Sequence, residues 1–168
     1  LLEARPDVGA CAPRLVDADG TPQPFAFGGE PNLPYLLRRG LSRWLLRRGL
    51  HDWGRSGIQE VDWASGACLL VRREVVDSVG PLDEDLFMYY EDVDWCLRMR
   101  RLGWRVAVQP EAVVTHLGGQ SLKQNTEARR CHYQSLRVFY RKHYRPPARA
   151  LMEAGLWVYR RIDPHIRG

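Results

Sequence analysis

Short apolar runs bounded by glycine, proline and aspartate alternate with stretches of helical periodicity along this 168-residue chain. The run at residues 8–16 ends in the turn-like sequence Asp-Ala-Asp-Gly and therefore predicts a strand. Residues 20–34 are rich in glycine and proline and predict a loop. Apolar residues and arginine pairs then alternate at helical spacing over residues 34–48, which predicts an amphipathic helix ended by Gly49.

Shorter elements are expected after Ile58. Residues 61–73 predict a strand with a break at Gly66, and the apolar run 67–71 within it predicts a fully buried segment. A short helix should follow and stop at Gly80, because glycine commonly ends helices.

The region after residue 90 predicts a helix from about 91 to 102, capped by Gly103. Two short strands are expected next, at residues 104–110 and 112–119. Because strands and helices are mixed along the chain, the sequence predicts an α/β fold.

Two further helices are expected at residues 127–144 and 148–162, separated by Pro146 and Pro147. We therefore divide the chain into an α/β domain at residues 1–126 and a helical tail at 127–168.

Composition is that of a globular protein, with 45% hydrophobic and 27% charged residues. No run of eighteen apolar residues is present, so no transmembrane helix is predicted. The first residue is Leu and no signal-peptide pattern follows it, so we expect a piece of a longer polypeptide. The four cysteines form no C-x-x-C pair and are expected to be free, buried thiols in a reducing cytosol: Cys11, Cys68, Cys96 and Cys131.

Positive charge is concentrated in the tail. Residues 129–168 carry ten Arg or Lys and two acids, whereas the first 128 residues carry fifteen basic and eighteen acidic side chains. This distribution indicates an anionic partner for the tail, either membrane phosphate or nucleic acid. No nucleic-acid-binding motif occurs, so we expect no nucleic-acid partner.

Three carboxylates, Glu91, Asp92 and Asp94, lie at the start of the helix expected at 91–102, after two tyrosines and before a tryptophan. Exposed N–H groups and the helix dipole favour negative charge there, so an Asp should stay ionised, as a general base requires. Simple helix capping is the alternative, and spacing by itself does not decide between them.

The wider sequence resembles a known family over three segments in order: V-D-W-A-S-G-A-C-L-L-V-R-R-E, then V-G-P-L-D-E-D-L-F-M-Y-Y-E-D-V-D-W-C-L-R-M-R-R-L-G-W-R-V, then P-E-A-V-V-T-H-L-G-G-Q-S. They resemble the C-terminal half of the catalytic domain of family 2 glycosyltransferases, especially rhamnosyltransferase-like members. The resemblance runs from about Val8 to Ser121 and more loosely to Tyr144.

This resemblance implies a partial nucleotide-diphospho-sugar transferase domain, of the GT-A, Rossmann-like fold. Such enzymes move a sugar from a nucleotide donor to an acceptor hydroxyl, usually with inversion. It implies that Asp92 is the general base and Glu91 its supporting neighbour. Asp94 is expected among the substrate-binding residues, with a structural role as the alternative.

The same resemblance implies that Ser65, Gly66 and Ala67 line the donor and acceptor pocket, where small side chains let a sugar approach the backbone. Trp63 is expected to provide a flat wall for a sugar face, with a place in the core as the alternative. His116 matches a position where some relatives hold the metal, with a purely hydrogen-bonding role as the alternative.

The family's nucleotide-binding half and its Asp-x-Asp motif are missing from this sequence. The divalent cation, Mg²⁺ or Mn²⁺, should therefore be held largely by residues outside this chain. We expect the isolated chain to be poorly stable and inactive, as part of an enzyme of cell-envelope polysaccharide synthesis. A non-catalytic module that binds acceptor or membrane is the alternative.

The tail adds an expectation about location. Tyr133, Leu136, Phe139 and Tyr140 lie at helical spacing with Arg and Lys between them. A basic amphipathic helix with aromatic residues is typical of a membrane interface, and relatives commonly use polyprenyl-linked acceptors. We therefore expect a cytoplasmic protein on the inner face of the cell membrane, the alternative being that both helices pack on the catalytic domain.

Overall fold

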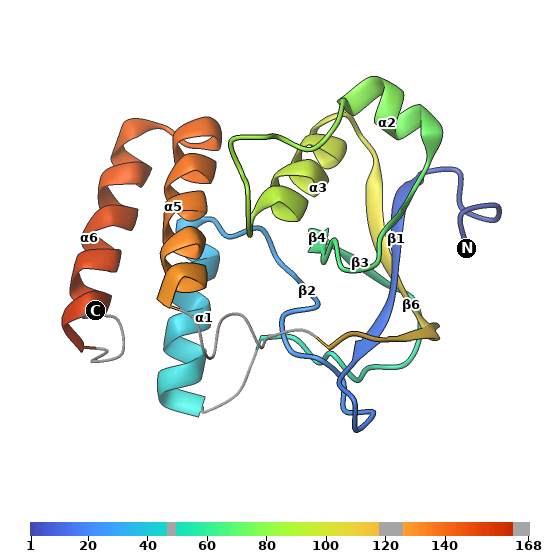
Figure 1. Cartoon of the computed structure of the whole chain (residues 1–168), viewed down its shortest axis with the longest axis horizontal. Coiled ribbons are helices and arrows are strands. Elements are labelled where there is room, and N and C mark those ends of the chain that lie inside the picture. The colour runs from blue at the N-terminus through green and yellow to red at the C-terminus, as the bar shows by residue number, and fades with distance from the viewer. Residues whose placement is uncertain (47–49, 118–125, 163–168) are drawn as a thin grey trace.

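The computed structural model describes residues 1–46, 50–117 and 126–162. Three helices, α1, α5 and α6, lie at one end of the molecule, and the sheet with α2 and α3 lies at the other (Figure 1). The strands are β1 Val8–Val16, β2 Phe27–Gly28, β3 Gln59–Val61, β4 Trp63–Ala64, β5 Leu70–Val71 and β6 Arg105–Thr115. The helices are α1 Leu33–Leu46, α2 Arg73–Val79, α3 Glu91–Arg101, α5 Thr126–His143 and α6 Pro146–Ile162.

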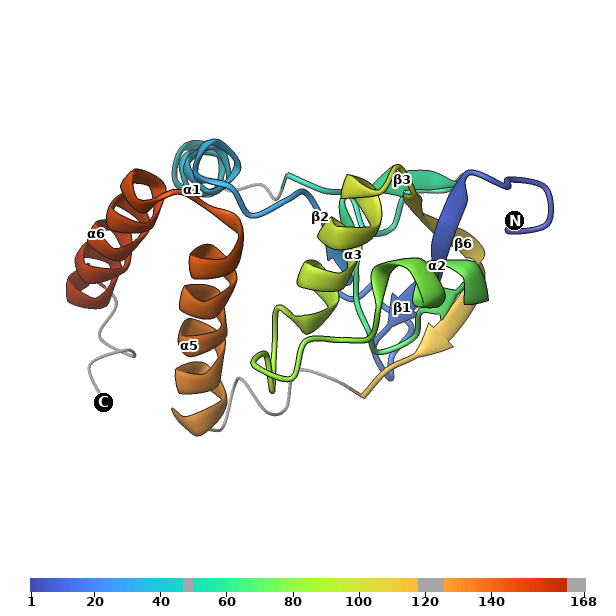
Figure 2. The same cartoon turned by 90° about the horizontal axis from the view of Figure 1, so that it is seen from above.

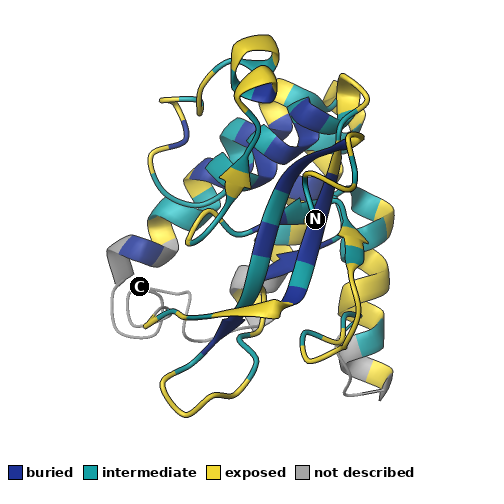
Figure 3. Ribbon diagram, turned by 90° about the vertical axis from the view of Figure 1, so that its right-hand side faces the viewer, coloured by how far each residue is buried: buried dark blue, intermediate teal, exposed yellow. Residues whose placement is uncertain are grey.

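The main sheet has four strands in the order β3-β6-β1-β5. β1 and β6 pair in parallel at its centre, while β3 and β5 pair antiparallel on the two sides. β2 and β4 form a separate antiparallel pair. The central strands are the most buried part of the sheet (Figure 3), because apolar residues of β1 and β6 face the core. The α/β fold class predicted from the sequence is confirmed.

The helix boundaries agree closely with the sequence pattern. α2 and α3 end before Gly80 and Gly103, which have φ of 81° and 90° and so adopt the left-handed conformation that glycine tolerates best. The helix expected at 34–48 is present as α1, but Gly49, its expected end, lies outside the described residues.

Two strand predictions were wrong. The strands expected at 104–110 and 112–119 form one strand, β6, which ends at Thr115, and residues 118–119 of the second expected strand lie outside the described residues. In the pairing with β1, Pro13 lies opposite Gln109 but the next residue, Arg14, lies opposite Val113. Pro110, which has no N–H to donate, lies within this irregularity and does not end the strand.

The apolar run 67–71 is not fully buried, because Leu70 is 65% exposed. β5 pairs with one strand only, and its side chains alternate between two faces. Leu69 and Val71 pack against the core, whereas the described residues leave the face of Leu70 uncovered.

The tail prediction needs a smaller correction. Pro146 and Pro147 do not separate the last two helices but lie in the first turn of α6, where a missing N–H costs nothing. The four cysteines are free as expected, although only Cys96 is fully buried. Within the described ranges, no helix is long and apolar enough to cross a bilayer.

Helix α3 lies between the sheet and α5, as the view from above shows (Figure 2). On one side, Cys96 and Met99 join the core formed by the sheet. On the other side, Val93 and Leu97 join a second core with residues of the tail, Leu136, Phe139, Tyr140 and Met152. The tail therefore shares a core with α3, which agrees with the alternative that its helices pack on the catalytic domain.

A buried ionic network fastens α3 to α5. The carboxylate of Asp94 is 0% exposed; Oδ1 lies 2.5 Å from His143 Nε2 and 2.8 Å from Lys142 Nζ, and Oδ2 lies 2.8 Å from Arg98 Nε. Burial would raise the pKa of Asp94, but the hydrogen bonds from His143, Lys142 and Arg98 together lower it well below its usual range. Asp94 is therefore held as a carboxylate.

We predict that Asp94→Asn destabilises the intact protein by about 3 kcal/mol, because it removes the buried negative charge that Arg98 and Lys142 bind. Since the pKa of Asp94 is lowered by folding, this contribution is present above about pH 4 and disappears as the pH falls through the folded-state pKa. Chemical denaturation of both proteins between pH 3 and pH 8 measures the difference.

Asp77→Asn is the matched control, because Asp77 also pairs with an arginine four positions away, Arg73, but on an exposed surface. Exposed pairs contribute about 0–1 kcal/mol, so this variant should unfold almost like the wild type. Equal effects of the two substitutions would contradict the role given to Asp94.

Candidate active site

An unusual backbone conformation precedes α3. Tyr89 and Tyr90 have φ of 66° and 68°, the left-handed region that residues other than glycine seldom adopt. Tyr90 is held there by packing, since its ring lies 5.5 Å from that of Phe139 and 5.2 Å from that of His132. Two consecutive strained residues at the start of a helix are typical of a site where side chains must be placed accurately.

The carboxylate of Asp92 projects from the first turn of α3 toward the segment after β4. Its Oδ2 accepts a hydrogen bond from the backbone N–H of Gly66 at 3.0 Å, and its Oδ1 accepts one from the N–H of Val93 at 2.8 Å. Burial raises the pKa of Asp92, and the two N–H donors offset only part of that effect. The backbone donors favour the charged form, as expected for a helix start, but burial has the larger effect, so the expectation that Asp92 is ionised stays a prediction.

The segment Ser65–Ala67, expected to line the substrate pocket, reaches Asp92 through Gly66, and its role toward a substrate stays a prediction. Gly66 contacts the acid directly, and a Cβ added at Gly66 would lie 3.6 Å from Asp92 Cβ. Ser65 Oγ accepts a 3.3 Å hydrogen bond from Ala67 N, which folds the segment into a tight turn. Gly66 and Ala67 are exposed, so a ligand can approach the backbone next to Asp92.

Glu91 and His132 add two buried polar atoms that lack partners among the described residues, Glu91 Oε2 and His132 Nδ1. The pKa of Glu91 is raised by burial and by the neighbouring Asp92. The pKa of His132 is lowered to about 4 by burial and by Arg39, so its imidazole is neutral at physiological pH. Unsatisfied buried groups are uncommon in stable cores and more often accompany function.

The sequence analysis missed His132. It belongs to α5, forty residues after Asp92, and its ring lies 5.4 Å from that of Tyr89 and 5.5 Å from that of Tyr133. The aromatic pattern of the tail was visible, but only the packing of α5 against the start of α3 brings this imidazole to the site.

Two other candidate residues have mainly structural contacts. Asp94 is enclosed by the side chains of Arg98, Lys142 and His143, which favours its structural alternative over substrate binding. Trp63 donates a 3.0 Å hydrogen bond from Nε1 to Gly29 O and packs against both cores. Its role toward a sugar stays a prediction.

His116 lies at the far end of β6. Its backbone N–H bonds Val16 O at 2.9 Å, and its Nδ1 lies 2.8 Å from Gln23 Oε1. Over the described part of the chain, no three His, Cys, Asp or Glu side chains are grouped so that they could hold a metal ion. These residues by themselves do not make a cation site, and metal binding by His116 stays a prediction.

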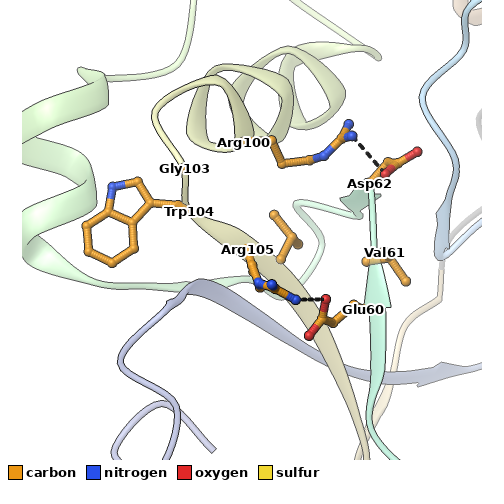
Figure 4. Close-up of a pocket in the computed structure, with 8 residues that line it drawn as sticks. Glu60, Val61, Asp62, Arg100, Gly103, Trp104 and Arg105 are labelled. Atoms are coloured by element: carbon orange, nitrogen blue, oxygen red, sulfur yellow. Dashed lines mark hydrogen bonds and ion pairs between the residues drawn. The ribbon is translucent and has the colours of Figure 1, made fainter.

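A separate hollow of about 320 Å³ lies at the other end of α3 (Figure 4). Arg100 pairs there with Asp62 at 3.0 Å and Arg105 with Glu60 at 2.5 Å. Arg100 is eight residues beyond Asp92, about 12 Å along the helix axis. Because its charges neutralise one another and it is distant from Asp92, this hollow is not part of the candidate site.

Comparison with known proteins matches residues 41–134 to the family described as glycosyltransferase-like family 2. This range contains Asp92, the 65–67 segment and His132. No solved structure matches the chain significantly.

Three of its relatives are named as rhamnosyltransferases. An N-acetylglucosaminyl-diphospho-decaprenol L-rhamnosyltransferase of Mycobacterium tuberculosis is 34% identical over 144 residues, covering 80% of this chain and 46% of the relative. A dTDP-rhamnosyl transferase of Shigella flexneri is 40% identical over 55 residues, 32% of this chain and 19% of the relative. A rhamnosyltransferase of Escherichia coli K12 is 39% identical over 56 residues, 33% of this chain and 21% of the relative.

The chain thus spans less than half the length of the curated relatives named here. The family match covers more than half of the chain, and it includes the acid and the small-residue turn that the fold places in contact. The chain therefore belongs to the family 2 glycosyltransferases.

Proposed function

We propose that this chain is the acceptor-side part of an inverting glycosyltransferase, which transfers a hexosyl or rhamnosyl group from a nucleotide-diphospho-sugar to a hydroxyl of a glycan acceptor. The observation that carries the proposal is the contact between Asp92 and the Gly66 backbone, because it puts a carboxylate at an open turn of small residues. Rhamnosyl transfer to a polyprenyl-linked glycan is the favoured case, since the Mycobacterium tuberculosis relative is named for a decaprenol-linked substrate.

In the proposed reaction, Asp92 accepts the proton of the acceptor hydroxyl while that oxygen forms a bond to the anomeric carbon. The bond between this carbon and the donor's diphosphate breaks at the same time, and the diphosphate leaves with the electron pair from the opposite face. A raised pKa suits this role, because a stronger base accepts a proton more readily.

Glu91 and His132 have supporting roles in this proposal. Both have a buried polar atom without a partner in the described structure, so either can bond a polar substrate group after a small rearrangement. The donor nucleotide and a divalent cation would be held mainly by residues outside this chain, since the described residues lack a cation site. In this proposal, the chain binds the acceptor, and the donor is bound mainly by residues outside this chain.

The tail is proposed to bring the protein to the inner face of the cell membrane in cell-envelope polysaccharide synthesis. α6 buries Met152 but leaves Leu151, Trp157 and Val158 exposed, and Arg161 lies 3.6 Å above the Trp157 ring. An exposed tryptophan next to arginine suits the head-group region of an anionic membrane. Nucleic acid is not proposed as a partner.

We predict that Asp92→Asn lowers kcat/KM of the intact enzyme by about 100-fold or more, because loss of a general base typically costs that much. The same variant should be at least as stable as the wild type, since folding raises the pKa of Asp92 and the charged form opposes burial. Steady-state kinetics and thermal unfolding test the two parts.

Asp77→Asn serves as the control, because it removes an exposed carboxylate of α2 and should leave kcat/KM unchanged. If Asp92→Asn retained turnover within about threefold of wild type, Asp92 would not be the base. Activity lost together with stability would indicate a structural role instead.

We further predict that the acid limb of the pH profile of kcat/KM has its midpoint above 3.9, the value for an unperturbed Asp. The base must be ionised, and burial raises its pKa, so activity should already fall at a pH where an exposed Asp is still charged. A midpoint at or below 3.9 would contradict the burial of the base.

For the tail, we predict that Trp157→Ser reduces retention of the intact protein on vesicles containing phosphatidylglycerol by about threefold or more. Trp157 is 56% exposed, so the substitution should not lower the melting temperature. Unchanged retention in a co-sedimentation assay would remove Trp157 from the membrane-binding surface.

A further inference from the structure

Helix α1 exposes a stripe of leucines that the fold does not use. Leu37, Leu41 and Leu45 are 73%, 55% and 59% exposed, and they follow one another at four-residue spacing on neighbouring turns. The helix is nonetheless anchored, because Leu33 and Leu36 pack against the second core. A helix with one side packed and a leucine stripe open to solvent has a face available for another apolar surface.

Every charged residue of the helical segment that carries this stripe is positive. Residues 33–48 contain five arginines and no acid. Arg38 and Arg39 are exposed directly beside Leu37. A surface that combines exposed leucines with positive charge is complementary to a partner that is apolar in its interior and anionic at its surface. An anionic lipid bilayer has both properties.

The position of α1 connects this face to the candidate active site. Arg39 lies 5.7 Å from the centre of the Phe25 ring. Its charge also contributes to the lowered pKa of His132, although burial contributes more, so Arg39 is close to the aromatic residues that precede Asp92. α1 also contacts α6, the helix with exposed Trp157. Figures 1 and 2 show α1, α5 and α6 together at the end of the molecule opposite the sheet.

We infer that α1 is an interfacial helix: its Leu37, Leu41 and Leu45 stripe enters an anionic bilayer and its arginines contact the lipid phosphates. With α6 beside it, this surface brings Asp92 close to the membrane, where the lipid part of a polyprenyl-linked acceptor is embedded. The statement about the acceptor rests on the proposed function, whereas vesicle binding by α1 does not depend on it.

The test compares the intact wild-type protein with the double variant Leu37→Ser and Leu41→Ser on vesicles of phosphatidylglycerol and phosphatidylcholine. Both leucines are more than half exposed, so the variant should fold normally. We expect its partition coefficient to fall by about tenfold or more, because two leucine side chains no longer leave water. Co-sedimentation at several lipid concentrations gives this coefficient.

A matched control is the double variant Leu82→Ser and Leu102→Ser, which removes two leucines that are 46% and 59% exposed outside α1. It should bind vesicles like the wild type. Arg38→Gln should weaken binding to the anionic vesicles and leave the weaker binding to pure phosphatidylcholine unchanged, since it removes only charge.

Three outcomes would overturn the inference. Wild-type protein that stays in the supernatant has no such surface, and equal binding by the α1 variant and the control places the membrane contact elsewhere. A wild-type dimer that the α1 variant converts to a monomer, seen by analytical ultracentrifugation, would show that a second copy covers the stripe.

The same α1 variant separates this inference from the proposed function. With a lipid-free acceptor in solution, its turnover should equal that of the wild type, while transfer to a vesicle-embedded acceptor should fall. Loss of vesicle binding without any transferase activity in the wild type would contradict the proposed function and leave the α1 surface supported.

Discussion

Asp94 joins parts of the chain that are far apart in sequence, because its carboxylate binds Arg98 on its own helix and Lys142 and His143 at the end of α5. The network extends further, since Arg98 donates to Val79 O and Pro81 O in the connection between α2 and α3. A buried carboxylate is costly unless it is fully bonded, so these partners have to remain in place together. The start of α3, and with it Asp92, is fixed by that requirement.

Asp92, two residues earlier, is in the opposite situation. Among the residues that the structure describes, it has two N–H donors and no cationic partner, and burial raises its pKa while that of Asp94 is lowered. One helix turn therefore contains one acid that stabilises the fold and one whose charge opposes it. A carboxyl group whose pKa is raised by burial beside an exposed turn is a candidate functional group, whereas an ion-pair network shifts a pKa for structural reasons. The strained Tyr89 and Tyr90 next to them fit the same interpretation.

Much of the fold could be predicted because the determining signals are local. Gly80 and Gly103 end helices through their own backbone preference, and the 8–16 run has the length and composition of a strand. The errors arose where tertiary context decides. Pro110 interrupts the pairing of β6 without ending the strand. Leu70 is exposed because one face of β5 is uncovered by the described residues. Neither outcome can be read from the local sequence pattern.

The site divides in the same way. The motifs that carry Gly66 and Asp92 were recognisable in the sequence, and the structure places these two residues in contact. The direction of the Asp92 pKa shift was not predictable, because desolvation depends on packing from several elements. His132 was missed for a related reason, since nothing in its own neighbourhood of the chain indicates that it packs against Tyr89 and Tyr90.

We propose that the tail positions Asp92, the proposed general base, through the His143–Asp94 contact. The most direct measurement is kcat of the intact His143→Phe enzyme at a temperature at which unfolding experiments show it to be folded. We predict that kcat falls by about tenfold or more while KM changes little, because a small displacement of a catalytic group is expensive in rate. A folded variant with lower stability but unchanged kcat would contradict the claim and reduce the network to a purely stabilising role.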